Sequence, residues 1–218
     1  MKYEQEVRDV LINNTIQLIA QGGFEKATTK AITHGGEQLP GIKMNEVYIY
    51  RLFGSKESLY SVAFSSLDQE IIVALRKCFR SHQGFEDATR ERLHRIFCDA
   101  WHFILGNEDH CRCYIRYYYS AYFHGETLKA HNRLFNEIIL GISPLFKDEA
   151  DVKSIMHSVF TTLLDFAVRI YNGDLENTKV NEDHIFNVLY CMMVTYFKDE
   201  KVSEPHESQF IYEREHYL

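Results

Sequence analysis

The sequence contains little proline and glycine, and it lacks long apolar runs. Of 218 residues, three are proline and eleven are glycine, and the glycines stand mostly where helical patterns end. Alternating apolar and polar residues between turn dipeptides, the signature of β-hairpins, are absent. Nowhere do about 18 apolar residues follow one another, as a membrane-spanning helix requires. The composition therefore predicts an all-α protein with no membrane partner.

The five cysteines are an odd number in a chain of ordinary size, and they do not indicate a disulfide framework. The first ten residues, MKYEQEVRDV, lack the apolar core of a signal peptide. Both observations lead us to expect a cytoplasmic protein.

Catalytic motifs are also missing. The chain has no G-x-S-x-G, no phosphate-cradling glycine loop and no H-E-x-x-H. His94, Cys98 and His102 are zinc-type ligands at a spacing of four, but on successive helical turns they span about 12 Å, too far for one ion. We expect no enzyme, no metal and no cofactor. The alternative is an all-α enzyme or metal-dependent sensor that uses the His/Cys-rich region 94–113, with a head that does not read DNA.

The stretch from Phe24 to Tyr60 predicts two short helices and the start of a third. Thr28–Thr29 can cap the first, and Gly35–Gly36 can end it in the left-handed conformation that glycine tolerates. A second helical pattern begins near residue 44 or 45 and ends at Gly54, where Ser55 can cap the next helix. With the apolar helix expected over residues 3–21, this is the layout of a helix-turn-helix head.

The same stretch resembles the N-terminal motif of TetR/AcrR-type transcriptional regulators. The matched positions are Gly23–Phe24, Thr28–Thr29, Ile49–Tyr50, Phe53, Ser55–Lys56–Glu57 and Leu59–Tyr60. One departure is that the turn from Gly35 to Asn45 is about five residues longer than is usual in the family, by our alignment to the motif. The resemblance implies a double-stranded DNA operator, a homodimer, and a small-molecule effector that relieves repression.

Eight residues are candidates for DNA contact. The resemblance assigns phosphate contacts to Tyr50 and Lys56, and capping and phosphate contacts to Thr28–Thr29. Asn45, Tyr48 and Arg51 recur every three residues on one helical face, and Asn and Arg suit adenine and guanine edges. Lys43 completes the set, and a merely solvated surface is the alternative for Tyr48 and Arg51.

Apolar residues at helical spacing continue beyond the head. We expect helices over 55–81, 86–105 and 126–140, the last closed by Gly141 and Pro144, and two long helices at the C-terminal end joined by a polar link, Asn172 to Glu182. The resemblance implies that these last two helices pair in a dimer. The expected interface residues are Ile155, Val159, Leu163, Ile170, Val188, Met192 and Tyr196.

The middle of the chain is rich in aromatic residues, and a largely apolar or aromatic effector would suit a pocket among them. For any single residue here the core is the favoured interpretation, whereas for the region as a whole the resemblance implies a pocket. The candidate ligand contacts are Phe97, Trp101, His102, Tyr114, Tyr118, Tyr122 and Phe160. Asp165, in an apolar helix, would be either buried and paired or a polar contact to the ligand.

The charge of the chain is −7, but residues 1–60 hold seven Lys or Arg and seven Asp or Glu, so the negative excess lies beyond the head. A neutral head gives DNA binding little electrostatic support. The expected protein is thus a TetR-like, all-α, effector-controlled repressor: a DNA-binding domain at 1–54, an effector-binding and dimerisation domain at 55–202, and a polar tail at 203–218.

Overall fold

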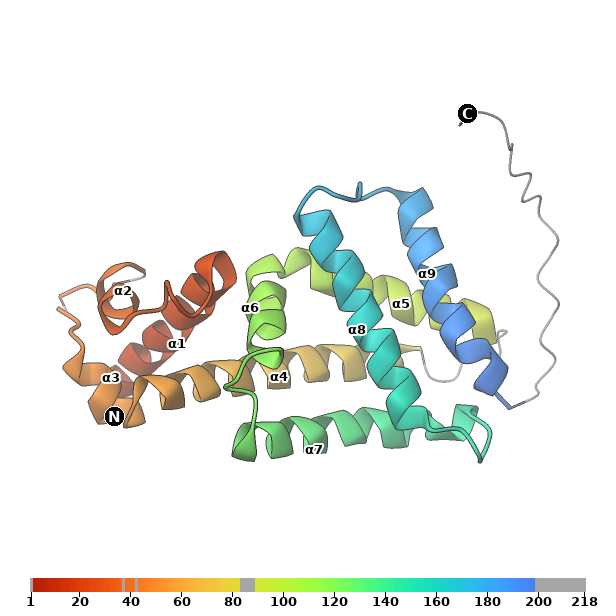
Figure 1. The fold of residues 1–218 in the computed structure, drawn as a ribbon, viewed down its shortest axis with the longest axis horizontal. Coiled ribbons are helices and arrows are strands. Elements are labelled where there is room, and N and C mark those ends of the chain that lie inside the picture. The colour runs from red at the N-terminus through yellow and green to blue at the C-terminus, as the bar shows by residue number, and fades with distance from the viewer. Residues whose placement is uncertain (1, 37, 42, 83–88, 199–218) are drawn as a thin grey trace.

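We analysed a computed structural model that describes residues 2–36, 38–41, 43–82 and 89–198 (Figure 1). Within these residues the secondary structure is helical, with one isolated antiparallel bridge between Phe146 and Phe197, so the all-α prediction is confirmed. No helix in the described part is long and apolar enough to cross a membrane. The tail predicted at 203–218 and the start of the helix predicted at 86 lie outside the described residues.

The helices are α1 (Lys2–Gly22), α2 (Thr29–His34), α3 (Val47–Phe53), α4 (Lys56–Ser81), α5 (Thr89–Gly106), α6 (Glu108–Tyr118), α7 (Gly125–Ile142), α8 (Val152–Tyr171) and α9 (Lys179–Met193), with the 3-10 turns η1 (Ser143–Leu145) and η2 (Val194–Tyr196).

Local capping explains where the head helices begin and end. The Thr28 hydroxyl accepts from the Ala31 N–H at 3.1 Å, and the Ser55 hydroxyl accepts from the Ser58 N–H at 3.0 Å, so both predicted N-caps are confirmed. Gly54 ends α3 with φ +81°, where a side chain would be strained. The left-handed ending predicted at Gly35 is wrong, because its φ is −94°.

The second helix of the head starts later than predicted. Helix α3 begins at Val47, with Glu46 as its N-cap residue, rather than near residue 44 or 45. The carbonyl oxygen of the Asn45 side chain accepts from the Val47 N–H at 3.0 Å just before the helix. Helix α1 braces the far end of α3: the Arg8 guanidinium donates to the Leu52 carbonyl at 3.0 Å and lies 4.5 Å from the centre of the Phe53 ring.

Helix α4 connects the head to the rest of the molecule. Its 26 residues make it about 39 Å long at the rise of an α-helix, and it runs from α3 past α6 toward α5 (Figure 1). Its buried face extends from Leu59 to Cys78, as the predicted apolar spacing requires.

A second connection joins the head to the larger domain. Helix α1 packs along α6, and an aromatic cluster of Phe24, Tyr60, Tyr117 and Tyr122 fills the junction, with ring centres 4.8 to 6.0 Å from Phe24. The Tyr60 hydroxyl donates to the Ala27 carbonyl at 2.6 Å. The head is therefore held by α6 as well as by α4.

The larger domain is built on α4, with α7 and α5 against it and α8 and α9 side by side across them (Figure 1). Gly141 lies inside α7, which ends at Ile142, so its predicted role as a helix end is wrong. Lys179 opens α9, so the last four residues of the predicted link to Glu182 are helical. The longer helix adds a turn to the α5–α9 contact.

One polar pair lies in this core. His131 on α7 and Asp68 on α4 are both buried, and His131 Nδ1 lies 3.0 Å from Asp68 Oδ1. A buried carboxylate without a partner would cost several kcal/mol, so each group makes the burial of the other tolerable. The pair fixes α7 against the middle of α4.

Candidate functional site

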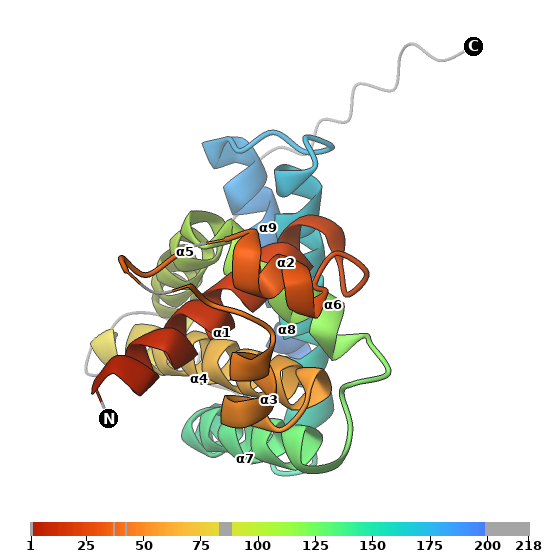
Figure 2. The same cartoon turned by 90° about the vertical axis from the view of Figure 1, so that its left-hand side faces the viewer.

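The end of the head carries exposed apolar and cationic side chains on and around α3. Val47 is 67% exposed and Tyr50 is 54% exposed, and they stand three residues apart on one face of the helix. Figure 2, viewed from the head end, places α2 and α3 at the front of the molecule. Apolar side chains left in water on a short helix suit contact with thymine methyl groups and the sugar backbone.

Two of the predicted base-edge residues interact with each other. The Arg51 guanidinium lies 4.7 Å from the centre of the Tyr48 ring, and the Tyr48 hydroxyl lies 3.2 Å from that of Tyr3 on α1. Arg51 is exposed and Tyr48 is half-buried. The stacked tyrosine therefore restrains the arginine on the outer face, while Asn45 has its side-chain oxygen engaged at the start of α3.

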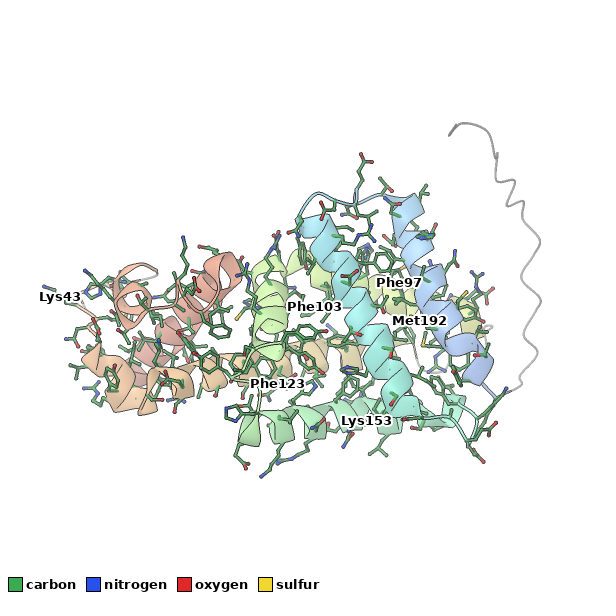
Figure 3. The ribbon with its side chains drawn as sticks, viewed as in Figure 1. Lys43, Phe97, Phe103, Phe123, Lys153 and Met192 are labelled. Carbon is green, nitrogen blue, oxygen red and sulfur yellow. The ribbon has the colours of Figure 1, made fainter. Side chains whose placement is uncertain are left out.

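The remaining head residues surround this face. Thr28 caps α2, and Thr29 donates to Glu46 Oε2 at 2.7 Å, which ties the beginning of α2 to the beginning of α3. Lys56 opens α4 with its ammonium 5.6 Å from the centre of the Tyr60 ring. Lys43 is exposed near the tip of the head, far from α8 and α9 (Figure 3).

An apolar cavity of about 100 Å³, partly open to solvent, lies between the helices of the larger domain. Side chains of α4, α5, α7, α8 and α9 line it, including Phe97 and Phe160 from the predicted ligand contacts. The volume is several times what one water molecule needs, and the lining offers water no polar side chain. The cavity suits a hydrocarbon group.

Two outer pockets adjoin this cavity. The first, about 190 Å³, lies between α6 and α8 and brings together Tyr114, Tyr118 and Phe160. Burial raises the pKa of Tyr114 well above its usual value, and its hydroxyl has no hydrogen-bond partner in the described residues. The second, about 360 Å³, lies between α7 and α8 and is polar. Four of the predicted ligand contacts, Phe97, Tyr114, Tyr118 and Phe160, thus line spaces beside α8.

Three predicted ligand contacts lie elsewhere. Trp101 is fully buried outside these linings, and its Nε1 has no partner within the described part of the chain. Tyr122 belongs to the aromatic cluster at the head. His102 is exposed on α5, 3.6 Å from Glu182 Oε2.

No family model matches the chain, and no curated protein matches it. Solved structures do. A TetR family transcription regulator from Marinobacter aquaeolei VT8 superposes with a TM-score of 0.66 at 18% identity, over 88% of this chain and 98% of that one. The chain has a TetR-like fold. A protein assigned to the TetR family from Shewanella sp. PV-4 gives 0.65 at 13% identity, covering 88% and 99%, and a TetR-like regulator from Rhodococcus sp. RHA1 gives 0.58 at 16%, covering 85% and 92%.

In this TetR-like fold the predicted dimer residues divide between two faces of α8 and α9. Val159 and Leu163 are buried and line the apolar cavity, so they point into the subunit. Ile155, Ile170, Val188 and Met192 are half-buried, and Tyr196 is 44% exposed. Met192 is visible between α8 and α9 in Figure 3. Asp165 is exposed, which corrects the expectation of a buried pair, and it borders the pocket between α6 and α8.

The α5 part of the His/Cys-rich region, His94, Cys98 and His102, contacts Glu182 and Asp183 of α9. Cys98 Sγ lies 3.3 Å from Glu182 Oε1, and burial together with this contact raises the pKa of Cys98 to about 11. Burial alone would raise the pKa of Glu182, but hydrogen bonds from Lys179 and Cys98 outweigh it and lower the pKa. Among the described residues no three such ligands are placed to hold a metal.

Sequence reasoning missed Val47 and the polar pocket between α7 and α8. The signal for Val47 was present, because it stands one turn before Tyr50 at the start of the same helix. The polar pocket combines residues about 25 apart in the sequence, on two helices whose crossing the sequence alone does not give.

Proposed function

We propose that this protein is a DNA-binding transcriptional regulator that acts as a homodimeric repressor. The observation that carries the proposal is the outer face of α3, where exposed Val47, Tyr50 and Arg51 stand on a helix that opens directly into α4. The second of two short helices, presented at the end of a head, is the element that enters the major groove in helix-turn-helix proteins. Residues 1–54 would be the DNA-binding domain and 55–202 the effector-binding and dimerisation domain.

Assigned roles follow the chemistry of the side chains. Arg51 would read a guanine edge, with Asn45 and Tyr48 beside it. Tyr50, Lys56, Lys43 and Thr28–Thr29 would contact phosphates. The balanced charge of residues 1–60 predicts modest non-specific affinity and a shallow dependence on salt.

Dimerisation would use the outer face of α8 and α9. Its half-buried apolar residues, Ile155, Phe166, Ile170, Val188 and Met192, would be covered by the same face of a second subunit. Such a two-fold dimer presents two recognition helices about 34–36 Å apart, one turn of DNA.

Control by an effector is a population shift in this proposal. A small apolar molecule in the larger domain would favour one packing of α7 and α8 against α4. Because α4 continues from the cavity to the head, that packing would change the separation of the two heads and release the operator.

The test is selection of bound sequences from a random DNA pool at moderate salt. The proposal predicts an enriched, two-fold symmetric site, with the preference at one base position relaxed in Arg51→Ala and the whole site retained in Arg80→Ala, which removes a cation from the last turn of α4. A folded dimer that enriches no sequence would overturn the proposal.

A further inference from the structure

The apolar cavity and the polar pocket beside it are separated by aromatic side chains. Phe135 of α7 lines both spaces. Phe160 of α8 lines the cavity and the pocket between α6 and α8. The centres of these two rings are 6.4 Å apart. Phe135 is therefore the residue that a ligand spanning the α7–α8 pocket and the cavity would pass, with Phe160 beside it.

The polar pocket has the chemistry of an anion site. Lys153 stands exposed in the first turn of α8, beside α7 (Figure 3). His157 lies one turn further along, with its Nδ1 held 3.3 Å from the Tyr118 hydroxyl, which leaves the other ring nitrogen for a ligand. Asn132 adds a neutral amide donor, whereas the Ser158 hydroxyl already donates to the Ser154 carbonyl at 3.0 Å. Together these groups offer one full positive charge and several hydrogen bonds.

Acidic groups near this pocket already have partners. Asp68 faces His131, which lines the pocket, at 3.0 Å. Asp151 accepts from both the backbone N–H and the hydroxyl of Ser154, at 3.1 and 2.7 Å, which lowers the pKa of Asp151. Asp68 is thus paired with His131, and Asp151 is capped by Ser154 while the nearby charge of Lys153 also helps to lower the pKa of Asp151.

We propose that the effector is an aliphatic carboxylate whose chain fills the apolar cavity and whose carboxylate binds Lys153 and His157. This inference rests on the proposed function, because it names the ligand of the same regulatory domain. A charge cannot enter a space that offers it no polar partner, and the cavity lining offers none. The chain passes Phe135, with Phe160 beside it, and the charged end stays with Lys153.

Titration of the purified full-length protein with decanoate, below its micelle concentration, tests the proposal. The uncharged control is decan-1-ol and the cationic control is decyltrimethylammonium. We expect saturable binding of one decanoate per subunit, about two- to fivefold tighter than decan-1-ol, as a partly exposed ion pair gives, and weakest binding of the cation. From hexanoate to decanoate, affinity should rise about fourfold per methylene until the cavity is full.

The protein carries its own reporter of cavity occupancy. Trp101 is the single tryptophan, and its ring lies 5.9 Å from that of Phe97, which lines the cavity. Its fluorescence should change with the same midpoint that calorimetry gives. Binding on an outer surface would leave the fluorescence unchanged and overturn the cavity assignment.

Two variants separate the charged end from the chain. Lys153→Gln should abolish the preference for decanoate over decan-1-ol and leave decan-1-ol binding unchanged. Lys129→Gln is the matched control, because Lys129 is an exposed lysine of α7 paired with Glu126. Leu163→Trp should fill the cavity and abolish binding of both molecules. If Leu163→Trp does not fold, Ala100→Leu fills part of the same cavity and should shorten the longest chain bound.

Equal affinity for acid and alcohol in the unchanged protein, or an unaltered preference in Lys153→Gln, would overturn the carboxylate assignment. Because binding is measured on free protein, the two proposals fail separately. A protein that binds decanoate and selects no DNA sequence refutes only the proposed function. One that selects an operator and binds no aliphatic chain refutes only this inference.

Discussion

The head and the larger domain arrange their candidate functional residues in opposite ways. In the head, Val47, Tyr50 and Arg51 point outward from a short helix. In the larger domain, Phe97 and Phe160 turn inward around a cavity. Outward side chains can change with little effect on folding, whereas inward ones also hold the core together. Substitutions of candidate functional residues should therefore leave stability nearly unchanged in the head and lower it in the larger domain.

Phe64→Ala should have the largest effect on this comparison. Phe64 is buried and stacks on Tyr114 and Tyr117 with ring centres 5.2 and 4.4 Å away. The cavity left behind should cost about 3–5 kcal/mol of unfolding free energy, measured by denaturant titration. Tyr50→Ala in the head is the control and should cost less than about 0.5 kcal/mol. Equal losses would erase the distinction between the two regions.

His131→Leu should have the next largest effect. It leaves the Asp68 carboxyl buried without its partner, which should cost about 3 kcal/mol in the same titration. The double change Asp68→Leu with His131→Leu removes both groups and should recover most of that loss. If the two residues are not coupled, adding Asp68→Leu will lower the stability further, and the double variant will be less stable than His131→Leu alone.

In the head, the effects should appear in DNA binding instead. Arg51→Ala should lose about 1–3 kcal/mol on the selected operator and relax preference at one base position. Lys56→Ala should weaken all sequences about equally, by about 1 kcal/mol. Fluorescence anisotropy with the operator and its single-base variants distinguishes the two patterns, and the reverse outcome would exchange the assigned roles.

Smallest are the effects of removing one helix cap from each region. Thr28 caps α2 in the head, and Thr178 caps α9, where its hydroxyl accepts from the Asn181 N–H at 3.2 Å. Thr28→Ala and Thr178→Ala should each cost about 1 kcal/mol. Because α1 packs on α6, both should shift a single cooperative transition. Two separate transitions in Thr28→Ala would show that the head unfolds by itself.

The sequence was sufficient to predict those features that depend on near neighbours along the chain. Thr28 and Ser55 cap helices because each bonds an amide three residues on, and α4 follows from apolar residues at helical spacing. The longer turn before α3 was also visible. The start of α3 was predicted two to three residues too early, although the contact there is also local: the Asn45 side chain accepts from the N–H two residues ahead.

Features that depend on how helices cross could not be read in the same way. Trp101 and Phe97 are neighbours on α5, but only Phe97 borders the cavity. Val159 and Leu163 belong to the regular apolar face of α8, which in fact has an inner and an outer side. When a helix is apolar over a wide arc, its sequence does not show which part of that arc faces solvent, a second subunit or a cavity.

The double attachment of the head has a consequence for exchanging parts between proteins of this fold. The junction of Phe24, Tyr60, Tyr117 and Tyr122 draws half of its rings from the region before residue 61 and half from the end of α6 and the turn after it. A chimera that took only residues 1–54 from another protein of this fold would set a foreign surface against Tyr117 and Tyr122. Grafting should succeed when α6 and its following turn move with the head, so the natural unit of exchange is discontinuous in the sequence.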